Sequence, residues 1–257
     1  MTHALRAEWT KLRTLSATAW LLLAAIALTV ALGAGVAHAV SYSAGDKQDL
    51  TKLCLTGVYV GQAIVAILAV QAISAEYSCG MIRVTLTAMP RRPVVLAAKA
   101  VVVGALVLAA GAVAILGSVL AGRLILPAGG FTAAHGYAQV SFGHGATLRA
   151  AGGSVLYLGL IALFSLGVAA AVRDGAVAIG AVLGLLYVFP IIAALIGGSQ
   201  LQRHLDQIAP MTAGLAIQDT INLGHLPITP WAGLGVLAAW TAAALLTGGL
   251  LLKVRDA

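Results

Sequence analysis

Six long apolar runs divide the chain and decide what it can fold into. They cover residues 19–40, 53–75, 100–122, 150–172, 176–198 and 231–252, and none contains Asp, Glu, Lys or Arg. A helix rises about 1.5 Å per residue, so about twenty residues cross a hydrocarbon core about 30 Å thick. The runs are continuous rather than alternating, which argues against the strands of a membrane barrel. We therefore predict an all-α integral membrane protein with six transmembrane helices.

Composition supports this fold and limits what else the chain can contain. Charged residues make up 9% of the sequence and the mean hydropathy is +1.01, so a water-soluble surface cannot be assembled. The six runs occupy more than half of the 257 residues, which leaves no room for a soluble catalytic domain. We expect one transmembrane domain over residues 1–257. The first run is too long for a cleaved signal peptide and is interpreted as a retained span.

The basic residues indicate the orientation of the spans. Short connections rich in Lys and Arg stay in the cytoplasm, which places both termini inside. Ten basic residues then lie inside: Arg6, Lys11, Arg13, Arg83, Arg91, Arg92, Lys99, Arg173, Lys253 and Arg255. Five lie outside: Lys47, Lys52, Arg123, Arg149 and Arg203. Because these charges are spread among the helix ends, the net charge of +7 reflects topology and does not indicate a nucleic-acid partner.

The segment before the first span, residues 1–16, has the pattern of a basic interfacial helix. On a helical wheel Leu5, Trp9 and Leu12 share one face. Basic residues flank this face: Arg6, Lys11 and Arg13. This pattern predicts a helix that lies in the cytoplasmic membrane surface, with Trp9 at headgroup depth. A solvated charged lead-in is the alternative.

The connection between the second and third spans, residues 76–93, combines an apolar stripe with positive charge. Ile82, Leu86 and Met89 are spaced for one face of a short helix. Pro90 ends that helix, and Pro93 suits the first turn of the next one. Three arginines border the stripe: Arg83, Arg91 and Arg92. The segment therefore fits a groove on a partner protein; a simple interfacial loop is the alternative.

Few polar groups lie in the spans, and the longest outer connection is itself amphipathic. Gln62 and Gln71 in the second span are the polar candidates for a pathway, and an otherwise apolar lining suits a hydrophobic or amphipathic substrate. In residues 199–230 we expect Pro210 and Gly214 to separate two short helices, with Ile208 just before the break. A surface loop is the alternative. Two small-residue motifs favour close helix packing: Gly57-x3-Gly61 and Gly180-x3-Gly184.

Three stretches resemble one known family, the ABC-2 type permeases of bacterial transporters, and most closely the small actinobacterial members. The most specific stretch contains Glu76-Tyr77-Ser78, Gly80 to Arg83, Thr85 to Ala88, Pro90 to Arg92 and Ala98-Lys99. The other two are Arg6 to Arg13, and Ala213-Gly214 followed by Pro230 to Gly233. Together with the six-span layout they cover nearly the whole chain in order. Cys79 stands where that family is expected to carry a small hydroxyl residue.

This resemblance implies a division of labour between two kinds of subunit. Residues 1–16 would form an amphipathic elbow helix, and residues 76–93 a coupling region that docks on a separate ATPase subunit. The implied coupling residues are Glu76, Ile82, Arg83, Leu86, Met89, Arg91 and Arg92. Residues 199–230 would form extracellular re-entrant helices that gate the pathway, with Gln62, Gln71, Ile208, Pro210 and Gly214 as gate or pathway residues. The implied assembly is a permease homodimer with two ATPases in a bacterial plasma membrane, exporting a drug, antibiotic, lipid or peptide.

The sequence agrees with this division at the nucleotide site. A P-loop needs Gly directly before its Lys, whereas the five lysines follow Thr10, Asp46, Thr51, Ala98 and Leu252. We therefore expect no catalytic, metal or cofactor site in this chain, and ATP and Mg²⁺ on the partner ATPase.

Three other classes of protein stay open. A secondary transporter would use membrane carboxylates, and the middles of the spans have none. The second is an intramembrane enzyme. Metalloprotease chemistry would need His-Glu-x-x-His, and no His is followed by Glu. A serine enzyme would need a membrane-embedded Ser with His partners, whereas His135 and His144 are expected in an outer loop. The last is a non-transporting membrane scaffold.

Overall fold

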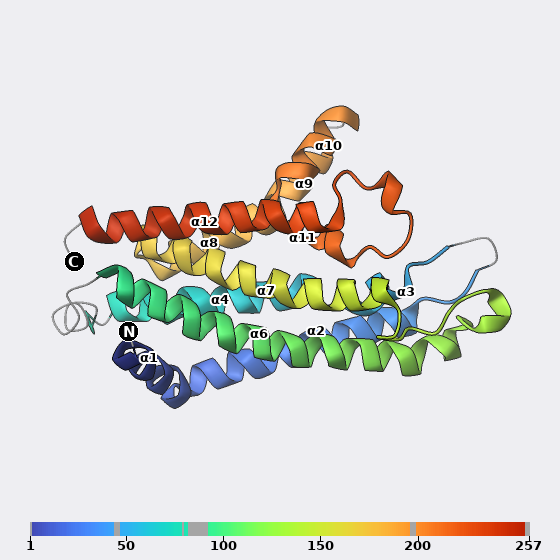
Figure 1. Ribbon diagram of the computed structural model, residues 1–257, viewed down its shortest axis with the longest axis horizontal. Helices are drawn as coiled ribbons and strands as arrows, with labels where there is room; N and C mark the ends of the chain where they lie inside the picture. Colours follow the sequence, from blue (N-terminus) through green and yellow to red (C-terminus); the bar gives the residue numbers. More distant parts are fainter. Residues whose placement is uncertain (1, 44–46, 79, 82–91, 196–198, 255–257) are drawn as a thin grey trace.

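Six helices long and apolar enough to cross a membrane form the body of the protein (Figure 1). The computed structural model describes residues 2–43, 47–78, 80–81, 92–195 and 199–254, and within these ranges the chain is helical and has no strand. The candidate spans are Ser16–Ala39, Leu50–Ser78, Pro93–Gly129, Gly145–Val172, Gly175–Ile192 and Pro230–Val254. The predicted all-helical fold with six candidate membrane-spanning helices is confirmed, and it is that of a multi-pass membrane protein.

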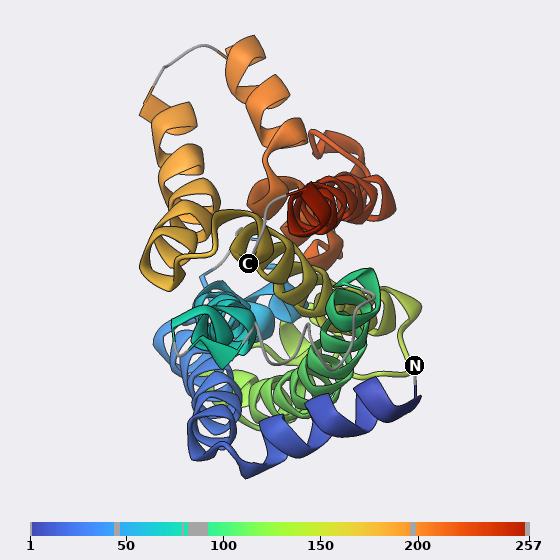
Figure 2. The same cartoon turned by 90° about the vertical axis from the view of Figure 1, so that its left-hand side faces the viewer.

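The described helices follow one another in this order: α1 (Thr2–Thr14), α2 (Ser16–Ala39), α3 (Leu50–Leu55), α4 (Val58–Ser78), α6 (Arg92–Ile125), α7 (Gly145–Val172), α8 (Gly175–Leu183), α9 (Phe189–Leu195), α10 (Ser199–Ile208), α11 (Pro210–Leu215) and α12 (Pro230–Val254). The start of α1 and the end of α12 lie at the same end of the bundle, as an even number of crossings requires (Figure 1). We call this the terminal end, and the other the loop end. Helix α1 lies across the terminal end, roughly perpendicular to the spans (Figure 2).

The second and fourth spans form the centre of the bundle. In the most apolar stretch of each, 61% of the residues are buried, against 17% in the first and fifth spans and 22% in the sixth. Helix α7 packs against α4, α6 and α12. Helix α2 also packs against α4 and α6. The first, fifth and sixth spans therefore leave apolar faces uncovered by the rest of the chain.

Glycines allow the first and second spans to approach each other closely. A Cβ atom added to Gly57 would lie 1.8 Å from the carbonyl oxygen of Thr29, and one added to Gly61 would lie 2.2 Å from the Thr29 hydroxyl. The first small-residue motif thus packs within this chain. A Cβ atom on Gly180 or Gly184 would meet nothing within 4 Å, so the second motif faces outward.

Two spans differ from the uninterrupted helices that hydropathy predicts. The second is interrupted at Thr56 and Gly57, between α3 and α4. The fifth bends: a π-helical turn, η3 (Gly184–Val188), separates α8 from α9. Pro190 explains the bend, because it has no N–H to donate to the carbonyl of Leu186 and its ring crowds that carbonyl. The third span is longer than its apolar run, and Pro93 lies in its first turn as predicted.

Residues 199–230 form helices in a different division from the predicted one. α10 ends at Ile208, and α11 begins at Pro210, so the break at the proline is confirmed. Gly214, however, lies inside α11, so the prediction that it helps to separate two helices is wrong. A Cβ atom there would lie 2.6 Å from the Tyr157 ring. Gly214 is therefore required for close packing of α11 on α7 rather than for a turn.

Candidate functional site

A buried cluster of four charged side chains joins three helices at the terminal end. Glu8 comes from α1, Glu76 from α4 and Lys99 from α6, and each is at most 4% exposed. The Lys99 ammonium donates to Glu8 Oε2 at 2.7 Å, to Glu76 Oε1 at 2.7 Å and to the Ala72 carbonyl at 3.1 Å. All three of its donors are used, which is what a buried ammonium needs.

Lys11 completes the cluster and balances its charge. Its ammonium lies 2.9 Å from Glu76 Oε1 and 3.4 Å from Glu8 Oε1, and its side chain is 31% exposed. Burial by itself lowers the pKa of Lys11, but the hydrogen bond to Glu76 and the attraction of both carboxylates outweigh it, so its pKa is raised. With two carboxylates and two ammonium groups the cluster is neutral. Neutrality makes its burial tolerable, because an unpaired charge at this depth would be costly.

The sequence of α1 places Glu8 on the face that contacts the bundle. Ala4, Glu8 and Leu12 are spaced four residues apart and are 2%, 2% and 8% exposed. Among the predicted elbow residues, Leu12 is buried, Leu5 is half-buried against the core, and Trp9 is 48% exposed. A helix over most of this segment is confirmed, from Thr2 to Thr14, but its inward stripe includes Glu8, which sequence reasoning missed.

The predicted coupling residues divide into those the structure describes and those it does not. Glu76 belongs to the charge cluster. Arg92 is the first residue of α6. The remaining five lie outside the described residues: Ile82, Arg83, Leu86, Met89 and Arg91. Glu76, near the end of α4, forms a direct ion pair with Lys99 in α6, so the helices on either side of this connection are joined in the cluster. Lys99, a lone charge inside an apolar helix, was the signal that could have revealed it.

Gln62 lies in a polar contact inside the bundle. It is fully buried, its amide nitrogen donates to Met211 Sδ at 3.3 Å, and its amide oxygen accepts from the Tyr157 hydroxyl. These bonds connect α4 with α7 and α11. The amide of Gln62 is therefore satisfied within the chain, and the side chain lines no open path there.

The other predicted gate and pathway residues do not gather at one site. Gln71 is exposed and lines a cavity of about 380 Å³ beside the charge cluster, between α1, α2 and α4. Ile208 is 57% exposed at the end of α10, and its carbonyl accepts from the Trp240 indole at 2.9 Å. Pro210 is buried at the start of α11. The structure thus brings together Gln62 and α11, but not the five residues as one site.

At the loop end, the Asp49 side chain binds residues 220 and 221 of the 199–230 segment to the start of α3. Its carboxylate accepts from Thr220 N at 2.6 Å, Thr220 Oγ1 at 2.7 Å and Ile221 N at 3.2 Å. It also caps α3 by accepting from the Lys52 amide. Lys52 in turn lies 2.6 Å from Asp219, and Arg149 donates to the Asp219 carbonyl. This contact was not predicted, because it joins residues about 170 positions apart.

Compared with protein-family models and with curated proteins, the chain matches none. Fold and site together define the class of the protein: a multi-pass, all-helical membrane protein with a buried charge cluster at its terminal end.

Proposed function

We propose that this protein is the membrane-spanning permease subunit of an ATP-driven exporter of the ABC-2 type. The observation that carries the proposal is the cluster of Glu8, Lys11, Glu76 and Lys99. It joins α4 and α6, the two helices that flank residues 79–91, and the family resemblance assigns the docking of an ATPase to that connection.

Through the cluster, a movement of the docked partner is transmitted to the spans. A shift of the connection pulls on Glu76 at the end of α4 and on Lys99 in α6 together. Because both are paired with α1 through Glu8 and Lys11, the interfacial helix and the second and third spans move as one unit. In this proposal ATP and Mg²⁺ bind only to the partner, and this chain supplies the translocation path.

The charges within the spans favour this proposal over a secondary transporter. Within the six candidate spans Glu76 is the one carboxylate, and both basic members of the cluster already pair with it. Ion-coupled transporters place carboxylates near the membrane midplane. An apolar path suits a hydrophobic or amphipathic substrate.

Replacement of Ile82 by Asp is expected to abolish association with the ATPase. The change puts a charge into the apolar ridge of the connection, and burying that charge in a docking groove costs several kcal/mol, or a loss of affinity of a hundredfold or more. The tagged chain should be purified with its ATPase and scored by nucleotide hydrolysis and transport. Thr87→Asp, a charge on the face opposite the ridge, is the matched control. Full recruitment and transport by the Ile82 variant would refute the docking hypothesis.

The uncovered face of the fifth span supports a homodimer. Gly180 and Gly184 have open space before them, and Val177 and Ile191 beside them are 60% and 59% exposed. From this face α9 and α10 project sideways, away from the other helices (Figures 1 and 2). The outer surface of α10 is polar, with Gln202, Arg203 and His204 exposed. Polar groups at membrane depth must lie against protein or line a water-filled cavity. In this proposal a second copy of the chain covers the polar surface of α10 or encloses such a cavity beside it.

A cysteine in place of Ile208 is expected to crosslink two copies in native membranes. Ile208 is exposed on the projecting helix, whereas Ala213, a neighbour on α11, is fully buried and unsuitable as a reporter. Cys54 is buried and can stay, and Cys79 is replaced by Ser in the test chain. Leu124→Cys, exposed on α6 across the bundle, is the control and should stay monomeric under oxidation. Equal crosslinking at both positions, or at neither, would argue against this dimer.

A further inference from the structure

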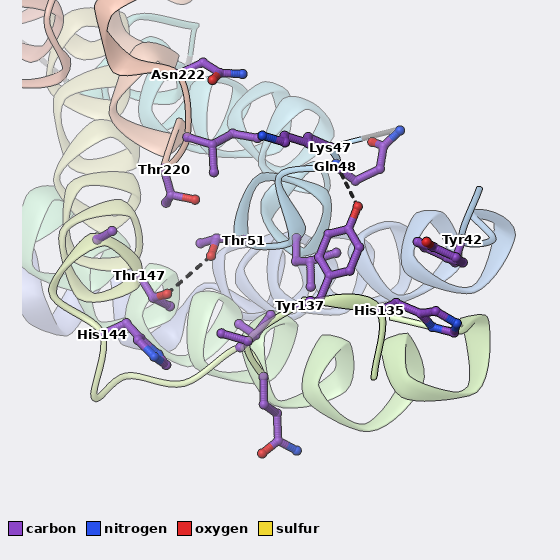
Figure 3. Close-up of a pocket in the computed structure, with 17 residues that line it drawn as sticks. Tyr42, Lys47, Gln48, Thr51, His135, Tyr137, His144, Thr147, Thr220 and Asn222 are labelled. Carbon is purple, nitrogen blue, oxygen red and sulfur yellow. Dashed lines mark hydrogen bonds between the residues drawn. The ribbon is translucent and has the colours of Figure 1, made fainter. Parts of the chain in front are cut away.

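A cavity of about 760 Å³ lies at the loop end, away from the charge cluster. Figure 3 shows the side chains that line it. Its walls come from three parts of the chain: Tyr42 with residues 47–51, residues 135–147 and residues 220–222. Sites for small organic molecules commonly have volumes of about 300–1,000 Å³. The cavity is therefore large enough for an organic ligand and is not only a hydration site.

Among the described residues that line this cavity, the one formal charge at pH 7 is positive, that of Lys47. Lys47, His135 and His144 line it, and no Asp or Glu does. Two nearby acids that the structure describes are already engaged: Asp49 accepts from Thr220, Ile221 and the Lys52 amide, and Asp219 pairs with the Lys52 ammonium. Uncharged polar side chains complete the lining: Gln48, Thr51, Gln139, Thr147, Thr220 and Asn222. This environment favours an anion.

The wall of the cavity is held in place before any ligand binds. The His135 ring stacks on Tyr42 with centroids 4.1 Å apart, and its Nδ1 donates to the Gly130 carbonyl at 2.8 Å. The Tyr137 hydroxyl accepts from Gln48 N at 3.2 Å, and Thr51 and Thr147 pair at 3.3 Å (Figure 3). Gly136 has a φ of 81°, a conformation that suits glycine and sets the turn between the two rings. A preorganised wall lowers the entropy cost of binding.

We propose that this cavity binds a phosphate-bearing organic molecule. Its donors come from three directions, so a tetrahedral phosphate with several acceptor oxygens uses them better than a planar carboxylate does. Leu50, Val140 and the two tyrosines provide the apolar surface for the organic part. Such a ligand joins residues 220–222 to α3 and α7, and so holds the 199–230 segment in place. The inference does not depend on the proposed export function.

The test uses the full chain in phosphatidylcholine nanodiscs, with phenyl phosphate as the probe and calorimetry and thermal unfolding as the readouts. Phenyl phosphate should bind and raise the unfolding temperature. The Lys47→Gln/His144→Gln variant should bind at least tenfold more weakly, and Lys47→Arg should retain binding. Arg123→Gln, which removes an exposed charge outside the cavity, is the matched control and should bind normally.

Two further measurements separate the sources of the phosphate and challenge the proposal. Inorganic phosphate that displaces phenyl phosphate supports a soluble ligand. Displacement only when phosphatidylglycerol is added to the nanodisc supports a lipid headgroup. Equal binding by the double variant and the Arg123 control would overturn the proposal, as would equal binding of uncharged benzyl alcohol.

Discussion

Replacement of Lys99 by methionine is expected to destabilise the protein by about 3–5 kcal/mol, the usual cost of breaking a buried ion pair by removing one partner. The change leaves the carboxylates of Glu8 and Glu76 buried with only Lys11, which is partly exposed, to balance them. Thermal unfolding of the purified chain should show a large drop in midpoint. Lys253→Met, at an exposed lysine near the end of α12, is the control and should change little.

A double variant tests whether the loss of charge balance causes this destabilisation. Glu8→Gln combined with Lys99→Met leaves one carboxylate and one ammonium, Glu76 and Lys11, which already form an ion pair at 2.9 Å. The double variant should therefore be more stable than the sum of the two single changes predicts. Additive losses would mean that packing, rather than charge balance, holds the three helices together.

The second large effect is expected from Gly233→Ala in α12. A Cβ atom at this position would lie 1.9 Å from the Ala213 carbonyl oxygen, and backbone cannot rotate away as a side chain can. Helix α11 must then move off α12, at an overpacking cost of about 1–3 kcal/mol. The variant should unfold at a lower temperature, and residues 199–230 should become more sensitive to protease.

Gly235, two residues further along the same helix, provides a matched control. A Cβ atom there would meet nothing within 4 Å, so Gly235→Ala should be neutral or slightly stabilising through helix propensity. If both substitutions behave alike, the close contact between α11 and α12 does not determine stability.

Hydropathy was sufficient to predict the six spans, because crossing a membrane requires long apolar runs. It could not predict the contacts between them. Every face of such a helix is apolar, so periodicity does not indicate which side packs inward. Gln62 shows the difficulty: its polarity was correctly singled out, but its partners, Tyr157 and Met211, are 95 and 149 residues away. The bend at η3 had a local signal, Pro190, which the continuous apolar run concealed.

The cluster was missed for a similar reason. Its members come from three helices, and Glu8 and Lys99 are separated by 91 residues. In the sequence Glu8 resembles one more surface charge of a basic helix, and Lys99 resembles a cation at the end of a span. Only the fold shows that these charges are inside and neutralise each other.

The order of synthesis gives this cluster a further consequence. Lys99 is the last of its four members to leave the ribosome, and until then Glu8 has only Lys11, on its own helix, as a partner within the cluster. The contact of α1 with α6 through the Glu8–Lys99 ion pair therefore forms only after the third span has been made. When that span is inserted, its ammonium is buried between carboxylates from two earlier helices, α1 and α4. The packing of α1 is thus completed only when the third span arrives, which links the biogenesis of the first helix to that of the third span.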